Sequence, residues 1–303
     1  MPDKPLKPNP IAKLSAVLFK IVVAIACLYY IIKCGRNIKL EDIRPSFIPT
    51  ALLAAIAYFL ATFLMVYGWQ VNLITISGRK ETFKLFAKIY FRSVPAKYLP
   101  SNIMHFAARH YQAIQAGYSH GVVATSNILE NILITISACG IIIAGILSGR
   151  LEFPTEFLNK SVCPQYIIPG AFVAVILLLI FVNKKFGRQV RFGTAVKALT
   201  KILAGYAVFL IVTGFIFLQV MNIAVPQNLN EHWDRIILIY ICAWTIGLVT
   251  PGAPGGLGVR ESVIIYLTSG LLTSDQALLG ALLFRIVTVT GEIMGYYFAR
   301  FLK

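Results

Sequence analysis

Apolar runs of about 20 residues recur along the chain, and each is long enough to cross a hydrocarbon core about 30 Å thick as an α-helix. Only 13% of the residues are charged, whereas a soluble domain has roughly 25%. The mean hydropathy of +0.76 agrees with this low charge. The sequence therefore predicts an all-α, polytopic integral membrane bundle and excludes an ordinary soluble domain.

Length and scarcity of charge predict about seven or eight spans. The runs lie at 14–33, 48–70, 121–147, 166–182, 199–221, 235–250 and 276–299. Spans and short loops use almost the whole chain, so we expect residues 1–303 to form one integral membrane domain. The first run is too long for a signal peptide and lacks a small-residue cleavage site, so we expect it to be retained.

The chain has 28 Lys and Arg against 12 Asp and Glu, a net charge of +16. Basic residues gather in the predicted loops 77–97 and 183–201, which the positive-inside rule places in the cytoplasm together with the N-terminus. The loop 33–44 carries four basic residues on the predicted outer side, so the orientation follows the majority. The basic residues do not form a soluble face with aromatic platforms, so we expect no nucleic-acid partner.

Two segments, 93–109 and 249–273, fit neither a span nor a free loop. The first is too polar and proline-broken to cross, and the second leads into only a short apolar stretch. The residues that break them are Pro100, Pro254, Gly255, Gly256 and Gly258. Non-helical backbone at membrane depth requires protein or a water-filled cavity to satisfy its polar groups. We therefore predict two re-entrant elements beside a polar cavity.

The two broken segments share a spacing, because Pro100 precedes Arg109 by nine residues and Pro251 precedes Arg260 by nine. Paired broken segments in corresponding halves are typical of transporters built from repeats. Little else aligns at this offset, so chance and a true repeat both remain open. The span count places both segments on the cytoplasmic side, as a parallel pair.

Polar and ionisable side chains at predicted membrane depth are candidate substrate-binding residues, because a charge there costs at least about 2.5 kcal/mol. They are Asn102, His105, Arg109, Glu130, Arg260, Glu261, Arg285 and Glu292. Arg285 and Glu292 share one helix face about 10 Å apart, too far to pair with each other. A structural ion pair of Arg285 with Glu130 or Glu261 is an equal alternative.

Arg260 and Glu261 open a short helix, and the N-terminus of a helix favours an anion such as phosphate. The neighbouring glycines are equally well explained by the tight turn alone. His105 and His110 lack a third ligand, and the aspartates do not cluster, so we expect no metal site and no cofactor. These absences disfavour an enzyme.

Three features resemble a flippase-like membrane family that includes the transmembrane region of lysylphosphatidylglycerol synthases. They are Lys97–Arg109 (KYLPSNIMHFAAR), Glu130 in the following span, and Pro254–Glu261 (PGGLGVRE). The resemblance covers nearly the whole chain in span order. It implies a helical fold with re-entrant segments and movement of lipid head groups between leaflets. It also places Arg109, Glu130, Arg260 and Glu261 on the polar pathway.

The chain departs from this family at two points. Ser101 stands where the family commonly has glycine, and the chain stops at Lys303, soon after the last predicted span. We therefore do not expect the soluble aminoacyl-transferase domain of the full synthases, and lipid lysinylation is not inferred.

The leading hypothesis is a lipid flippase or scramblase-like transporter in a prokaryotic cytoplasmic (inner) membrane. Its partner would be a membrane lipid, either an anionic phospholipid or a lipid-linked precursor, with Arg109 and Arg260 binding phosphate. One alternative is an integral membrane transferase that modifies a lipid. Another is a non-transporting membrane partner of a lipid-modifying enzyme. The sequence does not fix the oligomeric state.

Overall fold

The computed structural model describes residues 47–98, 104–151, 192–250 and 254–302, and within them the regular structure is helical, without strands. Five helices are long and apolar enough to cross a membrane. They are α2 (Phe47–Ser77), α5 (His120–Leu147), α8 (Phe192–Ala224), α9 (Trp233–Val249) with the 3-10 turn η3 (Leu229–His232) before it, and α11 (Ser274–Phe301). The predicted polytopic helical membrane bundle is confirmed. The predicted spans 14–33 and 166–182 lie outside the described residues.

Short helices make up both segments that the sequence marks as broken. The first, 93–109, begins at the end of α3 (Phe83–Ser93) and includes the 3-10 turn η2 (Val94–Tyr98) and the first half of α4 (Met104–Gln115). The second continues from α9 through the 3-10 turn η4 (Pro254–Gly256) into α10 (Val259–Leu267). At about 1.5 Å per residue these helices, apart from α9, are too short to cross a membrane.

The basic segment 77–97, expected as a loop, is largely the amphipathic helix α3. Its basic residues recur every fourth position at Lys84, Lys88 and Arg92, while Phe86 and Phe91 are buried. The charge of this segment suggests a loop, but its apolar residues recur with helical spacing and pack onto the bundle.

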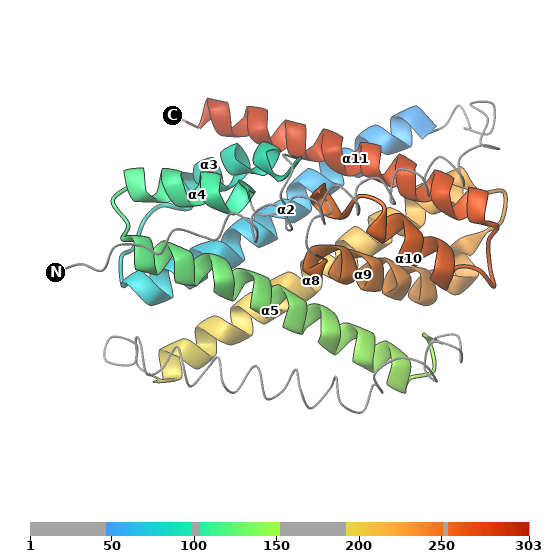
Figure 1. Cartoon of the computed structure of the whole chain (residues 1–303), viewed down its shortest axis with the longest axis horizontal. Helices are drawn as coiled ribbons and strands as arrows, with labels where there is room; N and C mark the ends of the chain where they lie inside the picture. Colours follow the sequence, from blue (N-terminus) through green and yellow to red (C-terminus); the bar gives the residue numbers. More distant parts are fainter. Residues whose placement is uncertain (1–46, 99–103, 152–191, 251–253, 303) are drawn as a thin grey trace, which may run out of the picture.

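The two helical hairpins lie at opposite ends of the bundle (Figure 1). The hairpin α3–α4 packs in one core with the C-terminal half of α2, the start of α5 and the end of α11. The hairpin α9–α10 packs in a second core with the first half of α2, the later part of α5 and the start of α11. The tips η2 and η4 contact each other between these cores.

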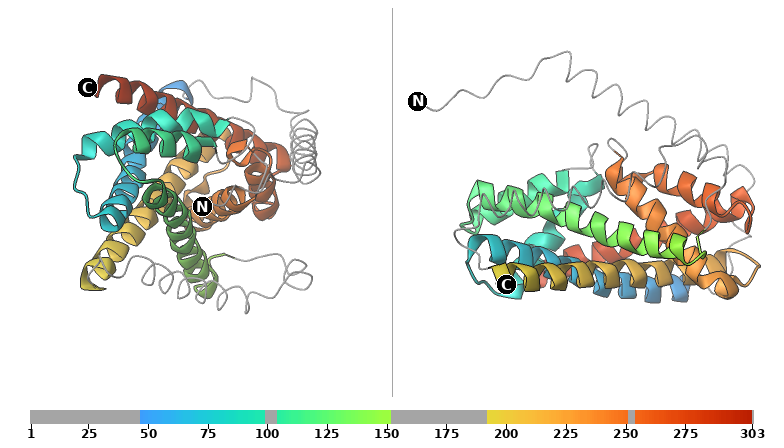
Figure 2. Two further views of the ribbon diagram at one scale, coloured as in Figure 1. Left: turned by 60° about the vertical axis from the view of Figure 1, so that its left-hand side comes forward. Right: turned by 90° about the horizontal axis from the view of Figure 1, so that it is seen from below.

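The order of a long helix, a hairpin and a long helix therefore occurs twice, as α2, α3–α4, α5 and as α8, α9–α10, α11. In Figures 1 and 2, α2 and α8 cross in opposite directions, and their hairpins enter from opposite ends. The arrangement is inverted, and the expected parallel pair is wrong. The error came from α9, whose length and apolarity suggest a full span, although the chain turns back after Val249 in the middle of the bundle.

Candidate functional site

Two adjoining cavities lie where the hairpin tips meet. The larger is about 130 Å³ and the smaller about 40 Å³. They share the wall residues Lys97, Trp244, Gly255 and Arg260, so we describe them as one central chamber. The charged residues on its wall are Lys97, Arg109, Glu130, Arg260, Glu261, Arg285 and Glu292. Six of these seven residues are among the sequence-predicted candidates.

A buried ion pair joins α4 to α5 on one side of the chamber. Arg109 and Glu130 are only 2% and 3% exposed and form a direct salt bridge. The Arg109 guanidinium lies 3.9 Å from the centre of the Tyr90 ring, and the Tyr90 hydroxyl donates to Glu130 Oε1 at 3.3 Å. The protein itself thus neutralises Arg109, which the sequence analysis expected to bind phosphate.

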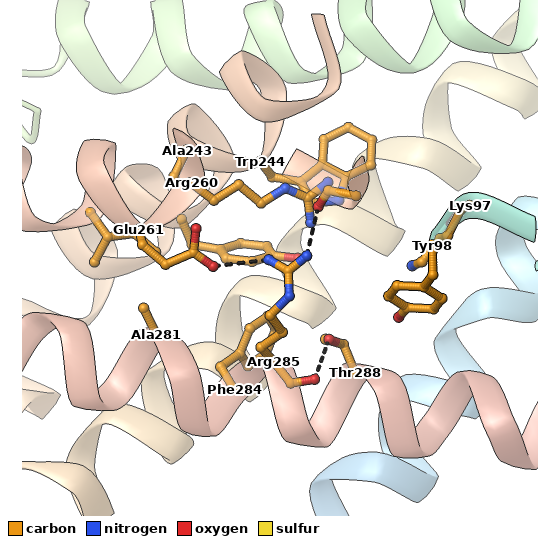
Figure 3. Close-up of a pocket in the computed structure, with 13 residues that line it drawn as sticks. Lys97, Tyr98, Ala243, Trp244, Arg260, Glu261, Ala281, Phe284, Arg285 and Thr288 are labelled. Carbon is orange, nitrogen blue, oxygen red and sulfur yellow. Dashed lines mark hydrogen bonds and ion pairs between the residues drawn. The ribbon is translucent and has the colours of Figure 1, made fainter. Parts of the chain in front are cut away.

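A second ion pair joins α10 to α11. Arg285 Nη1 lies 2.9 Å from Glu261 Oε1, as one of the two sequence alternatives expected (Figure 3). The Gly258 N–H donates to Glu261 Oε2 at 2.6 Å, so the chain's own carboxylate lies at the start of α10. In both repeats, an ion pair therefore ties the second limb of the hairpin to the next long helix. In the first pair the arginine lies on the hairpin and the glutamate on the long helix, and in the second pair the two residue types are exchanged.

Glu292 on α11 accepts hydrogen bonds from three side chains. It pairs with Lys97, and the hydroxyls of Tyr98 and Tyr58 donate to it at 2.7 Å and 3.2 Å. Burial lowers the pKa of Lys97, and Glu292 opposes this shift. Gly291 allows α2 to approach closely, because a Cβ there would lie 2.7 Å from the Ala55 carbonyl oxygen. This close approach brings Tyr58 to Glu292.

Arg260 is the chamber cation that has no carboxylate partner among the described residues. Its guanidinium lies 5.6 Å from the centre of the Trp244 ring, and its buried Nε has no hydrogen-bond partner in the described chain (Figure 3). A Cβ on Gly247 would lie 2.6 Å from Arg260 Cγ, and one on Gly256 would lie 2.7 Å from Nε. Two glycines thus make room for this side chain.

The glycines of the second broken segment have positive φ angles, a backbone conformation that glycine adopts readily. Gly255, Gly256 and Gly258 have φ values of 58°, 73° and 80°, which side chains with a Cβ rarely adopt. Pro254 begins η4. Pro100 and Asn102 lie outside the described residues, so their predicted roles remain predictions.

His105 lines the chamber, as expected from its position in the broken segment. Burial, followed by the charges of Arg109 and Lys97, lowers the pKa of His105 to about 3. The imidazole is therefore neutral near pH 7 and adds no charge to the chamber.

Several chamber residues are not among the sequence-predicted candidates, namely Tyr58, Tyr90, Lys97, Tyr98 and Trp244. Lys97 carried a usable signal, because this charged residue lies within the broken segment 93–109, which is predicted to border a polar cavity. The aromatic residues carried none, since their pattern is the same as that of other apolar residues in the spans.

The fold and the chamber define a polytopic helical membrane protein with ionisable groups enclosed near the middle of its bundle. Residues 17–293 match the family model described as the lysylphosphatidylglycerol synthase TM region, and the chain therefore belongs to this family. The suspected family is confirmed. A search of the curated proteins finds no match to the chain. The family indicates a multi-pass membrane protein whose biology concerns lipids.

Proposed function

We propose that the protein is a lipid flippase or scramblase-like transporter that moves an anionic phospholipid or lipid-linked precursor between the leaflets of a prokaryotic cytoplasmic membrane. The observation that carries this proposal is the charge of the chamber. Its described wall holds four cations, Lys97, Arg109, Arg260 and Arg285, and three carboxylates, Glu130, Glu261 and Glu292. Among the described residues, one of these positive charges has no carboxylate partner, and it lies on Arg260.

An uncompensated charge at membrane depth is costly and therefore marks a functional site. A lipid phosphate supplies the missing negative charge, and its oxygens accept charge-assisted hydrogen bonds from a guanidinium. The match between one excess cation and one anionic group supports an anionic head group as the ligand.

The inverted arrangement supports transport over chemical modification of the lipid. Sites in transporters with inverted repeats lie near the membrane midplane, between broken helices of the two halves. The chamber lies between two such hairpin tips. Glu130 and Glu261, the carboxylates that the transferase alternative would use, are each already engaged by an arginine.

Leaflet exchange in liposomes tests the proposal directly. Purified protein is reconstituted with head-group-labelled phosphatidylglycerol, and loss of label to a membrane-impermeant quencher is followed over time. We expect faster exchange than in protein-free liposomes, and faster exchange of this anionic lipid than of zwitterionic phosphatidylcholine. Mass spectrometry of the same lipids detects any modified product.

Three outcomes separate the competing functions. Exchange without a modified product supports the transporter. A folded protein that converts lipid but moves none would establish the transferase instead. A folded protein that neither moves nor converts anionic or isoprenoid-linked lipids, and that co-purifies with a lipid-modifying enzyme, would favour the membrane-partner role.

Replacing Gly247 with alanine is expected to weaken binding of an anionic lipid by about tenfold, or about 1.4 kcal/mol. The added Cβ would collide with Arg260 Cγ and displace the guanidinium without changing the charge of the chamber. Binding of a short-chain phosphatidylglycerol is measured by calorimetry. Gly205→Ala is the matched control, because a Cβ at Gly205 on α8 meets nothing within 4 Å. Equal affinities for the two variants would contradict the proposal that the position of Arg260 determines lipid binding.

A further inference from the structure

An apolar groove of about 1010 Å³ lies beside the central chamber. We call it the side groove and define it by the residues that line it on α4, α5 and the end of α9. On α4 the groove lies along the face that carries Phe106, His110 and Ile114. On α5 it extends from His120 to Ile132, and it ends at Leu248–Thr250.

The side groove faces outward from the helical bundle. Tyr111, Ile128 and Val249 on its wall are 65%, 59% and 64% exposed. Its length along α5, from His120 to Ile132, is about 18 Å at 1.5 Å per residue. The hydrocarbon core of a bilayer is about 30 Å thick, so the groove has the depth of about one leaflet.

The side groove adjoins the central chamber. Phe106, Asn131 and Leu248 line both the groove and the larger cavity of the chamber, which Arg260 also lines. An occupant of the groove can therefore have one end among apolar side chains and the other end beside a cation. At the far end, His110 and His120 are in hydrogen-bond contact at 3.0 Å and join α4 to α5.

We infer that the side groove holds an acyl chain of the lipid whose phosphate binds at Arg260. This inference rests on the proposed function and adds a site for the apolar part of the substrate. A diacyl lipid has the required chemistry, since it combines an apolar chain the length of one leaflet with a single anionic group. The helix of a partner protein has no phosphate to place at Arg260, so the position of the groove beside the chamber favours the lipid.

Filling the groove tests the inference. Ile128→Trp and Ile132→Trp add bulk to two residues on its α5 wall. We expect each to slow the exchange of long-chain phosphatidylglycerol in liposomes by about tenfold, as overpacking of a close-fitting site predicts. Ile211→Trp is the matched control, because Ile211 on α8 is exposed at 39% and lies outside the groove. Its exchange rate should stay within about twofold of wild type.

A second measurement tests lipid binding in the groove independently of transport. Phosphatidylglycerol with a photoreactive group in its acyl chain is cross-linked to wild-type protein, and labelled peptides are mapped. Concentrated labelling of 106–114 and 124–132, suppressed by unlabelled lipid, supports the groove. Labelling that is no stronger there than around Ile211 would overturn it.

The two experiments separate failure of the groove from failure of the proposed function. Wild-type exchange with unaffected tryptophan variants would overturn the groove alone. Absence of exchange in the wild type would overturn the proposed function. The cross-linking result would then show whether the groove binds lipid at all.

Discussion

Replacing Arg260 with alanine is expected to slow the exchange of anionic lipid by about thirtyfold or more. Arg260 is the chamber cation without a carboxylate partner in the described chain, so its charge is available to a lipid phosphate. Loss of a charge-assisted contact in a desolvated site costs about 2 kcal/mol or more, which is about thirtyfold in rate. The liposome assay with labelled phosphatidylglycerol measures the change.

The chain provides a matched control for this substitution. Arg300 also lies against an aromatic ring, with its guanidinium 5.7 Å from the centre of Tyr296, but it is exposed at the end of α11. Arg300→Ala should leave the exchange rate within about twofold of wild type. Arg260→Lys keeps the charge but loses the planar fork of donors, so we expect an intermediate rate. If Arg260→Ala and Arg300→Ala exchanged lipid equally fast, the excess chamber charge could not be the basis of transport.

Helix positions could be predicted from the sequence because they depend on local properties. Length, apolarity and scarcity of charge place the described spans from α2 to α11, and prolines and glycines mark the broken segments. The direction in which the hairpins enter depends on whether α9 crosses or turns back. Its length and composition do not decide this, since the first limb of a long hairpin and a short span have the same pattern.

Partners within the chamber depend on tertiary contacts that sequence spacing does not encode. The eventual pairing of Arg285 with Glu261 was one of two alternatives, because either carboxylate could meet the same cation. Arg109 and Glu130 lie 21 positions apart on different helices, so no helical periodicity connects them. For this reason the chamber charges are predictable from the sequence, but the one that has no carboxylate partner in the described chain is not.

The buried ion pair of Arg109 and Glu130 is expected to stabilise the position of the hairpin α3–α4 more than any other single interaction. Replacing Glu130 with methionine leaves Arg109, only 2% exposed, without its counter-charge. We expect the free energy of unfolding to fall by about 3–5 kcal/mol, as when one partner of a buried ion pair is removed. Reversible unfolding in mixed micelles by a denaturing detergent measures this loss.

Replacing both residues with methionine should restore most of the lost stability, because a buried pair exchanged for apolar residues of similar volume is often neutral. The surface pair of Arg79 and Glu81 is the control, since Glu81→Met should change the free energy of unfolding by less than about 1 kcal/mol. If the double variant lost as much stability as the two single variants together, the buried ion pair would not stabilise the hairpin.

The folded double variant also decides the role of Arg109 in transport. Retained lipid exchange would limit Arg109 to positioning α4 against α5, whereas lost exchange would make it a second phosphate ligand beside Arg260.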